Sequence, residues 1–389
     1  MPITQTPKVT YSEGTSNPTL NGEGAQIPIF IGITGNNNPK TGIQKFKNYA
    51  ECSKTIANGG IGTDTSSNPL LSVLKDFFEE SRKVNADDIG IPYVYVIDLG
   101  TGKTNDTLNT TAFTDAMELA KSKREVEVEI YVGFKKEDTP STILGIMNSA
   151  YNSIEIDSKD GNPRTAYFTV TDMNDTELMD LTDKATPTAS PVYINKSRVG
   201  LIEPLLFGKT LAKILTTHYS EEPGFTDYRS VTPGTFKERT PAEELALQNS
   251  GIIFNRDERA GQNIHPKINL AVSTSFSENE DERPNDCLLH MRRNVDQLIR
   301  EAFEVAYSQL KRNETEVNLS FLQSDLDVLV DEKINKGYML EGTQILVQES
   351  EVNPYDLKIE GVAVPVNSTL LITFSMYIEQ PNAIVRGGN

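Results

Sequence analysis

The sequence predicts a multi-domain protein of the α/β (α+β) class, with an alternating strand-helix body and a second α/β domain toward its C-terminal end. The body is predicted because strand and helix patterns alternate between residues 27 and 220. The second domain is predicted because a long amphipathic helix precedes a further helix and a new set of strands. Residues 3–12 and 369–379 add a strand near each chain end, since both alternate apolar and polar side chains.

The N-terminal strand has Ile3, Val9 and Tyr11 on its apolar side. Residues 13–26, which follow it, are almost all polar residues, glycine or proline, and this composition predicts a flexible linker. We therefore expect the strand to be tethered loosely to the body, without a tight hairpin turn. The pattern alone leaves open whether the strand folds back onto its own domain.

The predicted body starts with an apolar strand over Ile27–Ile33. Its first long helix is expected to begin at Pro69, because Asn68 precedes it and proline is favoured at the first helical position. Thr240 is expected to cap a short helix at Pro241–Asn249. The remaining body elements are strands at Pro92–Leu99, Val126–Phe134, Thr165–Thr171 and Gly251–Phe254, and helices at Ala112–Lys123, Pro140–Tyr151, Thr176–Ala185 and Ile202–His218.

The long amphipathic helix follows a strand predicted at Ile264–Ser275 and an acidic loop. Its apolar residues keep the helical period from Leu288 to Leu310 and predict one buried face. His290 is expected on the exposed flank of this helix. The opposite, polar face is predicted to carry Arg292, Arg293, Asp296, Arg300, Glu301 and Glu304.

The C-terminal domain continues with a helix at Leu319–Lys336 that stops at Gly337, and with strands at Gly342–Gln348, Leu357–Val366 and Thr369–Glu379. The apolar side of the last strand consists of Leu370, Ile372, Phe374, Met376 and Ile378. The predicted domains are an N-terminal arm with its linker at 1–26, the body at 27–260, the C-terminal domain at 261–379 and a C-terminal tail at 380–389.

The composition excludes several classes of protein. With 37% hydrophobic and 24% charged residues and no apolar run long enough to span a bilayer, the chain matches neither a membrane protein nor a disordered one. No secretory signal is recognisable at the N-terminus. A net charge of −18 argues against a nucleic-acid partner, which would select a basic surface. The two cysteines, Cys52 and Cys287, are predicted to be free thiols in a reducing compartment.

No catalytic, metal or cofactor site is predicted. The segment Thr101–Thr104 resembles the end of a phosphate-binding loop, but Ile97 stands where that motif needs its first glycine. The three histidines, His218, His265 and His290, lack the spacing of a metal site or of a catalytic signature. The absence of such motifs favours a structural protein over an enzyme, and a nucleotide-binding α/β enzyme remains as an alternative.

Several segments, taken in order, resemble the sheath protein of contractile phage tails and of R-type bacteriocins. Ile27–Gly35 is similar to the first core strand of that family, which ends in Ile-Gly-x-Thr. Met291–Asp296 is similar to its long helix with a Val-Arg-Arg motif. The further similar segments are Pro92–Ile97, Val231–Gly234, Pro241–Leu245, Asn249–Arg256, Ile268–Ser275 and the closing strands within Glu341–Ser375. This chain lacks the tryptophan-containing segment that family members often have before the long helix.

The resemblance implies a subunit that polymerises as stacked hexameric rings around an inner tail tube and contracts to drive that tube through a cell envelope. The implied partners are other copies of the chain, the tube protein, and baseplate and terminator proteins; neither nucleic acid nor membrane insertion is implied. The implied location is a virion tail or tail-like particle, assembled in the bacterial cytoplasm. A non-contractile phage structural or baseplate protein remains as a second alternative.

The resemblance also implies roles for particular residues. Terminal arms cross between neighbouring subunits and add strands to a sheet in the C-terminal domain. The candidate residues for this exchange are Ile3, Val9, Tyr11, Ile372, Phe374, Met376 and Ile384. The C-terminal domain is expected to face the tube, with Arg292, Arg293 and Arg300 as candidate contacts; an ordinary solvated helix face is the alternative for these arginines.

Overall fold

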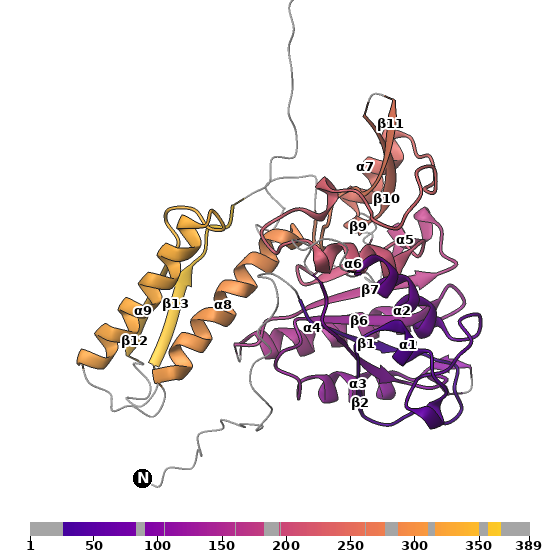
Figure 1. The fold of residues 1–389 in the computed structure, drawn as a ribbon, viewed down its shortest axis with the longest axis horizontal. Coiled ribbons are helices and arrows are strands. Elements are labelled where there is room, and N and C mark those ends of the chain that lie inside the picture. The colour runs from indigo at the N-terminus through magenta and orange to yellow at the C-terminus, as the bar shows by residue number, and fades with distance from the viewer. Residues whose placement is uncertain are drawn as a thin grey trace, which may run out of the picture.

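The computed structural model describes residues 26–82, 90–104, 106–159, 161–182, 194, 196–260, 262–276, 287–309, 316–349 and 357–366. These residues form a large body built on one sheet and a smaller C-terminal unit that extends to one side of it (Figure 1). The predicted terminal strands and the C-terminal tail lie outside the described residues.

The body is built around a seven-stranded sheet with the order β2-β3-β1-β6-β7-β8-β9. All neighbouring strands in this sheet are parallel except β2, which pairs antiparallel with β3 at one edge. The strands are β1 (Pro28–Gly32), β2 (Ile43–Phe46), β3 (Val94–Asp98), β6 (Val128–Lys135), β7 (Thr165–Thr171), β8 (Val199–Ile202) and β9 (Ile252–Ile253). The predicted α/β layer with a partly parallel sheet is therefore confirmed.

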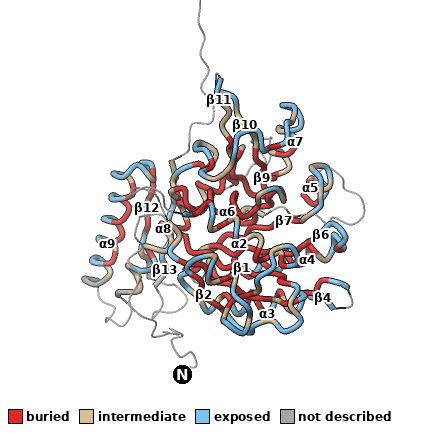
Figure 2. The backbone as a smooth tube through the Cα atoms, turned by 45° about the vertical axis from the view of Figure 1, so that its right-hand side comes forward, coloured by how far each residue is buried: buried red, intermediate tan, exposed pale blue. Residues whose placement is uncertain are grey.

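Successive side chains of each strand point to opposite faces of the sheet, and apolar residues lie on both faces. Helices therefore cover both faces. Ile29 and Ile31 of β1 belong to a core formed with α3 (Thr110–Ala120), α4 (Pro140–Lys159) and α5 (Asp175–Thr182). Phe30, between them, belongs to a second core on the other face, formed with α2 (Pro69–Glu80) and α6 (Phe207–Thr216). Figure 2 shows the central strands buried throughout, with exposed residues gathered on the outer turns.

Short elements complete the body. Helix α7 (Pro241–Asn249) packs beside β9, and the hairpin of β10 (Asn255–Ala260) and β11 (Asn263–Ile268) projects from the same end (Figure 1). The others are α1 (Tyr49–Cys52), the 3₁₀ turns η1 (Ile56–Asn58) and η2 (Pro223–Phe225), and the small hairpin of β4 (Lys103–Thr104) and β5 (Thr107–Leu108). Cys52 and Cys287 are both buried, and they form no disulfide with each other.

Two predicted helix starts are confirmed in atomic detail. The side chain of Asn68 accepts a hydrogen bond from the backbone N–H of Leu71, and Pro69 is the first residue of α2. At the start of α7, Thr240 and Glu243 form a reciprocal capping box, in which each side chain binds the backbone N–H of the other residue.

Other elements differ from the prediction. The helix predicted at Ile202–His218 is present as the shorter α6, and Leu206 just before it has φ of 56°. Strand β8, which ends at Ile202, was not predicted. The strand predicted at Ile264–Ser275 ends at Ile268. The residues after it run through the core of the body, where the backbone of Thr274 binds the carbonyl of Val199. Strand β2 was not predicted.

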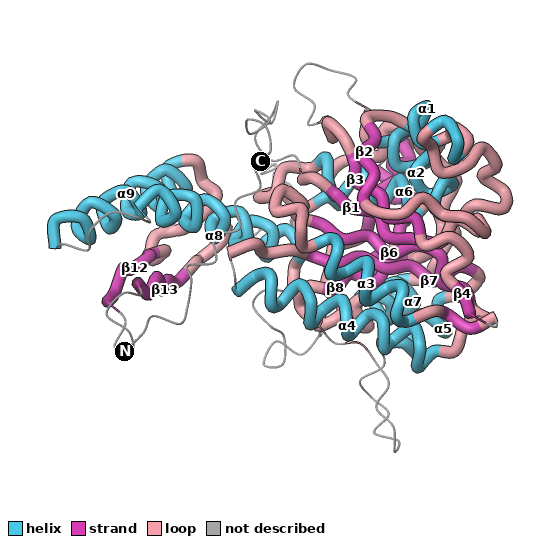
Figure 3. The backbone as a smooth tube through the Cα atoms, turned by 90° about the horizontal axis from the view of Figure 1, so that it is seen from below, coloured by secondary structure: helices cyan, strands magenta, loops and turns pink. Residues whose placement is uncertain are grey.

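The C-terminal unit consists of helices α8 (Leu289–Gln309) and α9 (Glu316–Asn335) and the antiparallel hairpin of β12 (Gln344–Glu349) and β13 (Leu357–Val362). The hairpin lies along one side of the two helices (Figure 3). A separate core holds this unit together; its buried members are Leu298, Ala302, Leu322, Leu326, Leu329, Val330, Met339 and Ile345. Residues 268–276 and 287–289, which the sequence prediction places in the C-terminal domain, contribute side chains to the core of the body.

Candidate assembly interface

Strand β13 presents one unpaired edge among the described residues, because the hairpin sheet contains only β12 and β13. The backbone hydrogen bonds of the residues just after β13 show which edge of the strand each N–H and C=O group faces. The carbonyl of Val364 accepts a hydrogen bond from Leu340, and the N–H of Val366 donates to Tyr338, so even-numbered residues point toward the β12 side. Since the direction alternates along a strand, Ile359 and Gly361 point their N–H and C=O groups away from β12.

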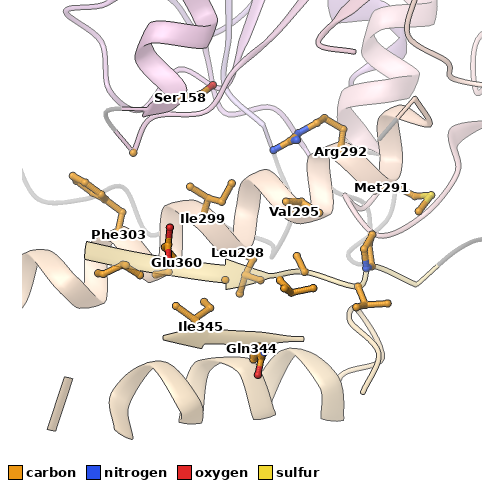
Figure 4. A pocket seen from close by; sticks show the side chains of 18 residues that line it. Ser158, Met291, Arg292, Val295, Leu298, Ile299, Phe303, Gln344, Ile345 and Glu360 are labelled. Atoms are coloured by element: carbon orange, nitrogen blue, oxygen red, sulfur yellow. The ribbon is translucent and has the colours of Figure 1, made fainter. Parts of the chain in front are cut away.

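An apolar groove of about 960 Å³ runs along this free edge. Its floor is a stripe on α8, formed by residues spaced four apart: Met291, Val295, Ile299 and Phe303. One wall is β13 with the residues after it, and Ser158, near the end of α4 in the body, lies on the opposite side of α8 (Figure 4). We call this feature the α8–β13 groove.

The α8–β13 groove leaves large apolar side chains open to solvent. Ile359 of β13 is 37% exposed, Val362 is 54% exposed and Phe303 of α8 is 40% exposed. An extended segment that paired with the free edge of β13 would direct every second side chain toward the α8 stripe. This arrangement of a free backbone edge above an apolar floor suits the addition of a strand.

The three candidate arginines of α8 lie at the junction between α8 and the body. Arg292 pairs with Asp296 one turn along the helix. Arg293 is 1% exposed and donates a hydrogen bond to the carbonyl of Thr217 at 2.8 Å. Arg300 donates to the side chain of Asn162, at 2.9 Å, and to the carbonyls of Val126 and Pro163. Their contact with an inner tube stays a prediction.

The polar face of α8 was expected in solvent, and the structure corrects that expectation. Asp296 is 6% exposed and accepts a hydrogen bond from Arg198 of the body at 2.7 Å. Arg198 also pairs with Glu155 of α4 at 3.1 Å. His290 is fully buried, with its Nδ1 atom 2.8 Å from a carboxylate oxygen of Glu222. These polar groups lie inside because each meets a hydrogen-bond partner from the body, which offsets the loss of hydration.

Burial changes the acid-base properties of this junction. It lowers the pKa of Arg293 and of Arg300, because a cation is less stable away from water. It raises the pKa of Glu127, and the nearby charge of Arg300 opposes that shift. The junction is therefore a polar contact between the body and the C-terminal unit, next to the apolar core of each.

In the loop at Thr101–Thr104, residues 103–104 form strand β4 of a small hairpin. A Cβ atom at Gly102 would lie 2.3 Å from the side chain of Ile33, and one at Gly133 would lie 2.6 Å from it. Ile33 thus fills the space beyond the carboxyl ends of β1 and β6, where parallel sheets often bind ligands. Among the residues that the structure describes, no group of three or more metal-ligating side chains occurs.

The candidate strand-exchange residues Ile3, Val9, Tyr11, Ile372, Phe374, Met376 and Ile384 all lie outside the described residues. The strand exchange stays a prediction for that reason. The described chain ends at Val366, a few residues before the last predicted strand and beside the α8–β13 groove. No helix in the described part of the chain has the length and apolar character needed to cross a membrane.

Sequence reasoning missed the α8–β13 groove. All apolar residues of the long helix were assigned to one buried face. The structure divides them: Leu298 and Ala302 belong to the core shared with α9 and also line the groove, whereas Ile299 and Phe303 line the groove and are not members of that core. The signal was the width of the apolar face, which is more than one neighbouring helix covers.

Comparison with known proteins gives likeness in structure alone. No protein-family model and no curated protein sequence matches the chain. The helical sheath of the anti-feeding prophage in its contracted state is similar with a TM-score of 0.62 and 12% identity, over 96% of this chain and 99% of that one. The contracted sheath complex of the PVC extracellular contractile injection system has a TM-score of 0.61 and 10% identity, over 97% and 98%.

A sheath tail protein from Listeria innocua is also similar, with a TM-score of 0.57 and 7% identity over 89% of this chain and 93% of that one. All three likenesses extend over most of both chains. The chain therefore has the fold of contractile tail sheath proteins.

Proposed function

We propose that this chain is the structural subunit of a contractile sheath. It polymerises as stacked hexameric rings around an inner tube, and contraction of the stack drives the tube through a target cell envelope. The observation that carries this proposal is the sheath fold, which extends over nearly the whole of this chain and of the sheath proteins compared with it. The α8–β13 groove supports it, since it offers a place for a neighbouring subunit.

Neighbouring subunits are joined through the free edge of β13. Arms from other copies, residues 1–12 and the segment after 379, each supply a strand that pairs with the hairpin sheet. A strand that forms about six backbone hydrogen bonds at roughly 1 kcal/mol net each, and buries two or three apolar side chains at ~2 kcal/mol each, holds its neighbour firmly. The polar linker at 13–26 lets the bodies move while these strands stay paired.

Contraction draws its energy from surface buried between subunits and uses no nucleotide. The C-terminal unit faces the tube, and Arg292, Arg293 and Arg300 are its candidate contacts. Contact through Arg293 requires the junction with the body to open, because that side chain is buried. Baseplate and terminator proteins bound the stack at its ends, and assembly takes place in the bacterial cytoplasm.

Electron micrographs of the purified chain test the proposal. Hollow cylinders are expected from the full-length protein. Deleting residues 1–12 should leave a folded protein, judged by an unchanged thermal unfolding transition, that no longer forms cylinders. Cylinders formed normally by the deletion would remove strand exchange from the proposal.

A non-contractile baseplate component is distinguished by the same micrographs, since it would give closed rings without stacking. For the enzyme alternative, nucleotide at millimolar concentration should leave the thermal unfolding temperature unchanged. This expectation rests on the space next to Gly102 and Gly133 that Ile33 occupies.

A further inference from the structure

The outer edge of β12 is covered by a side chain of α9. The side-chain oxygen of Gln323 accepts a hydrogen bond from the backbone N–H of Val347 at 2.9 Å. Its side-chain nitrogen donates to the carbonyl of Ile345 at 2.8 Å. One amide group thereby pairs with a donor and an acceptor of the strand, as the backbone of an adjacent strand would.

A second contact fixes the orientation of this amide. The Gln323 nitrogen also donates to the carboxylate of Asp327 at 2.8 Å, one turn further along α9. The Asp327 carboxylate accepts hydrogen bonds, so the group of Gln323 that faces it must be the side-chain nitrogen, which is a donor. This contact keeps the nitrogen of Gln323 toward Ile345 and the oxygen toward Val347.

The two edges of the hairpin are therefore different. Ile345 lies opposite Gly361 in the ladder, and Val347 lies opposite Ile359. Residues opposite each other in this way direct their backbone groups to opposite edges. On the β12 edge these groups meet Gln323, whereas on the β13 edge they face the α8–β13 groove.

We propose that Gln323 determines which edge of the hairpin accepts an incoming strand. It closes the β12 edge, so that residues 3–12 of a second copy of the chain add only along β13. That segment suits the groove, because Ile3, Val9 and Tyr11 lie on one side of it and would face the apolar α8 stripe. This inference rests on the proposed function, since it concerns the strand exchange of the sheath.

The selectivity has a physical purpose. An exposed strand edge pairs with any available strand, and proteins that avoid aggregation cover or charge such edges. A hairpin open on both edges would add strands in two directions. With one edge closed, the arms of other copies add in a single direction, outward from β13.

The first experiment tests the edge closure in the unassembled full-length chain. Amide hydrogen exchange is measured over residues 344–349 and 357–362 in the wild type and in Gln323→Ala. The variant is expected to exchange on the order of fivefold faster over 344–349, which corresponds to the ~1 kcal/mol net of one hydrogen bond. Exchange over 357–362 should be unchanged. Equal exchange rates over 344–349 in both proteins would overturn the closure.

Gln297→Ala is the matched control. Gln297 lies on α8 and its side chain donates to Glu301 of the same helix. This substitution removes the same kind of side-chain amide, but from α8 and not from α9. Amide hydrogen exchange over the β12–β13 hairpin should therefore stay at the wild-type rate.

The second experiment follows assembly. In wild-type cylinders, residues 357–362 should gain protection and residues 344–349 should keep the protection of the free chain. Gln323→Ala should gain protection over 344–349 as well, and should give irregular aggregates in sedimentation and micrographs. New protection over 344–349 in wild-type cylinders, or normal cylinders from the variant, would refute edge selection. If the wild-type protein forms no assembly, the proposed function is refuted. The amide hydrogen exchange of the unassembled chain still tests whether Gln323 closes the β12 edge.

Discussion

Arg164 and Glu129 form the most deeply buried ion pair of the body, with both side chains fully shielded and 2.9 Å between their charged atoms. The guanidinium also donates to the carbonyl of Lys123 at 2.9 Å. Replacing Arg164 with alanine leaves the Glu129 carboxylate buried without its counter-charge. We expect Arg164→Ala to lower the free energy of unfolding by roughly 3–5 kcal/mol, measured by chemical denaturation.

The control for this prediction is Lys121→Ala. Lys121 pairs with Glu118 at 2.7 Å on the surface of α3, where water screens the charges. Its loss should change the unfolding free energy little. A similar effect of both substitutions would contradict the role given to burial.

Cys52 predicts a dependence of stability on pH. Burial, with the nearby charge of Glu51, raises the pKa of this thiol from 9.0 to about 12. Between these values the unfolded chain releases the thiol proton and the folded chain keeps it. The contribution of the thiol to stability is therefore complete below pH 9 and is lost as the pH rises toward 12, by up to ~1.4 kcal/mol per pH unit.

The measurement compares the wild type with Cys52→Ala by denaturation from pH 8 to 11. Stability of the wild type should fall more steeply with pH than that of the variant. Parallel curves would show that the thiol ionises equally in both states.

At the scale of single elements, a substitution in the α8–β13 groove can test assembly without much effect on the stability of the fold. Ile359 is 37% exposed and contacts the groove, so Ile359→Thr keeps a β-branched residue while making the edge more polar. We expect the unfolding free energy to change by less than about 1 kcal/mol, as for most exposed positions. Cylinder formation should require a higher protein concentration. The measurement is the total protein concentration at which half of the protein sediments as cylinders.

Val328→Thr is the comparison for this substitution. Val328 is 63% exposed on α9 and does not line the groove. This comparable change, of an exposed β-branched apolar residue to threonine, should leave assembly at the wild-type concentration. Equal weakening by both variants would mean that the groove is not the site of strand addition.

The elements were predicted best where a local signal is strong. Asn68 with Pro69, and Thr240 with Glu243, mark helix starts through bonds within a few residues, and both are present. Strand β2 was missed because its four residues alternate weakly and pair only with β3, which is distant in the sequence. The polar face of α8 was misplaced for the same reason: the partners that bury Asp296 and His290, Arg198 and Glu222, are far away along the chain.

Only part of the candidate site could be predicted from the sequence. The two helices and the hairpin of the C-terminal unit follow from periodicity, with small shifts at their ends. The α8–β13 groove does not, because periodicity shows that Ile299 and Leu298 are apolar but not that Leu298 belongs to the core shared with α9 and Ile299 does not. The pairing of Gln323 with β12 depends on how α9 lies beside the strand, which no local pattern specifies.

For the whole molecule, the net charge of −18 opposes self-association. Copies of an acidic chain repel one another, and dissolved salt screens that repulsion within about 10 Å at 0.1 M. We expect cylinder formation to become more extensive as the salt concentration rises from 20 mM to about 300 mM, a range over which this screening length falls severalfold. Light scattering at fixed protein concentration measures this. Assembly that weakens with salt would show that opposite charges between subunits dominate.

The separate core of the C-terminal unit has a consequence for the life of the protein in the cell. Among the described residues, eight buried apolar side chains form the core of that unit, far fewer than form the cores of the body, so we expect the unit to open locally at a smaller free energy. If strand exchange occurs as proposed, proteases should reach this opened form first in copies whose β13 is not yet covered by a neighbour's strand. We expect copies outside an assembly to be degraded from their C-terminal third and assembled copies to persist, so that turnover would remove surplus subunits.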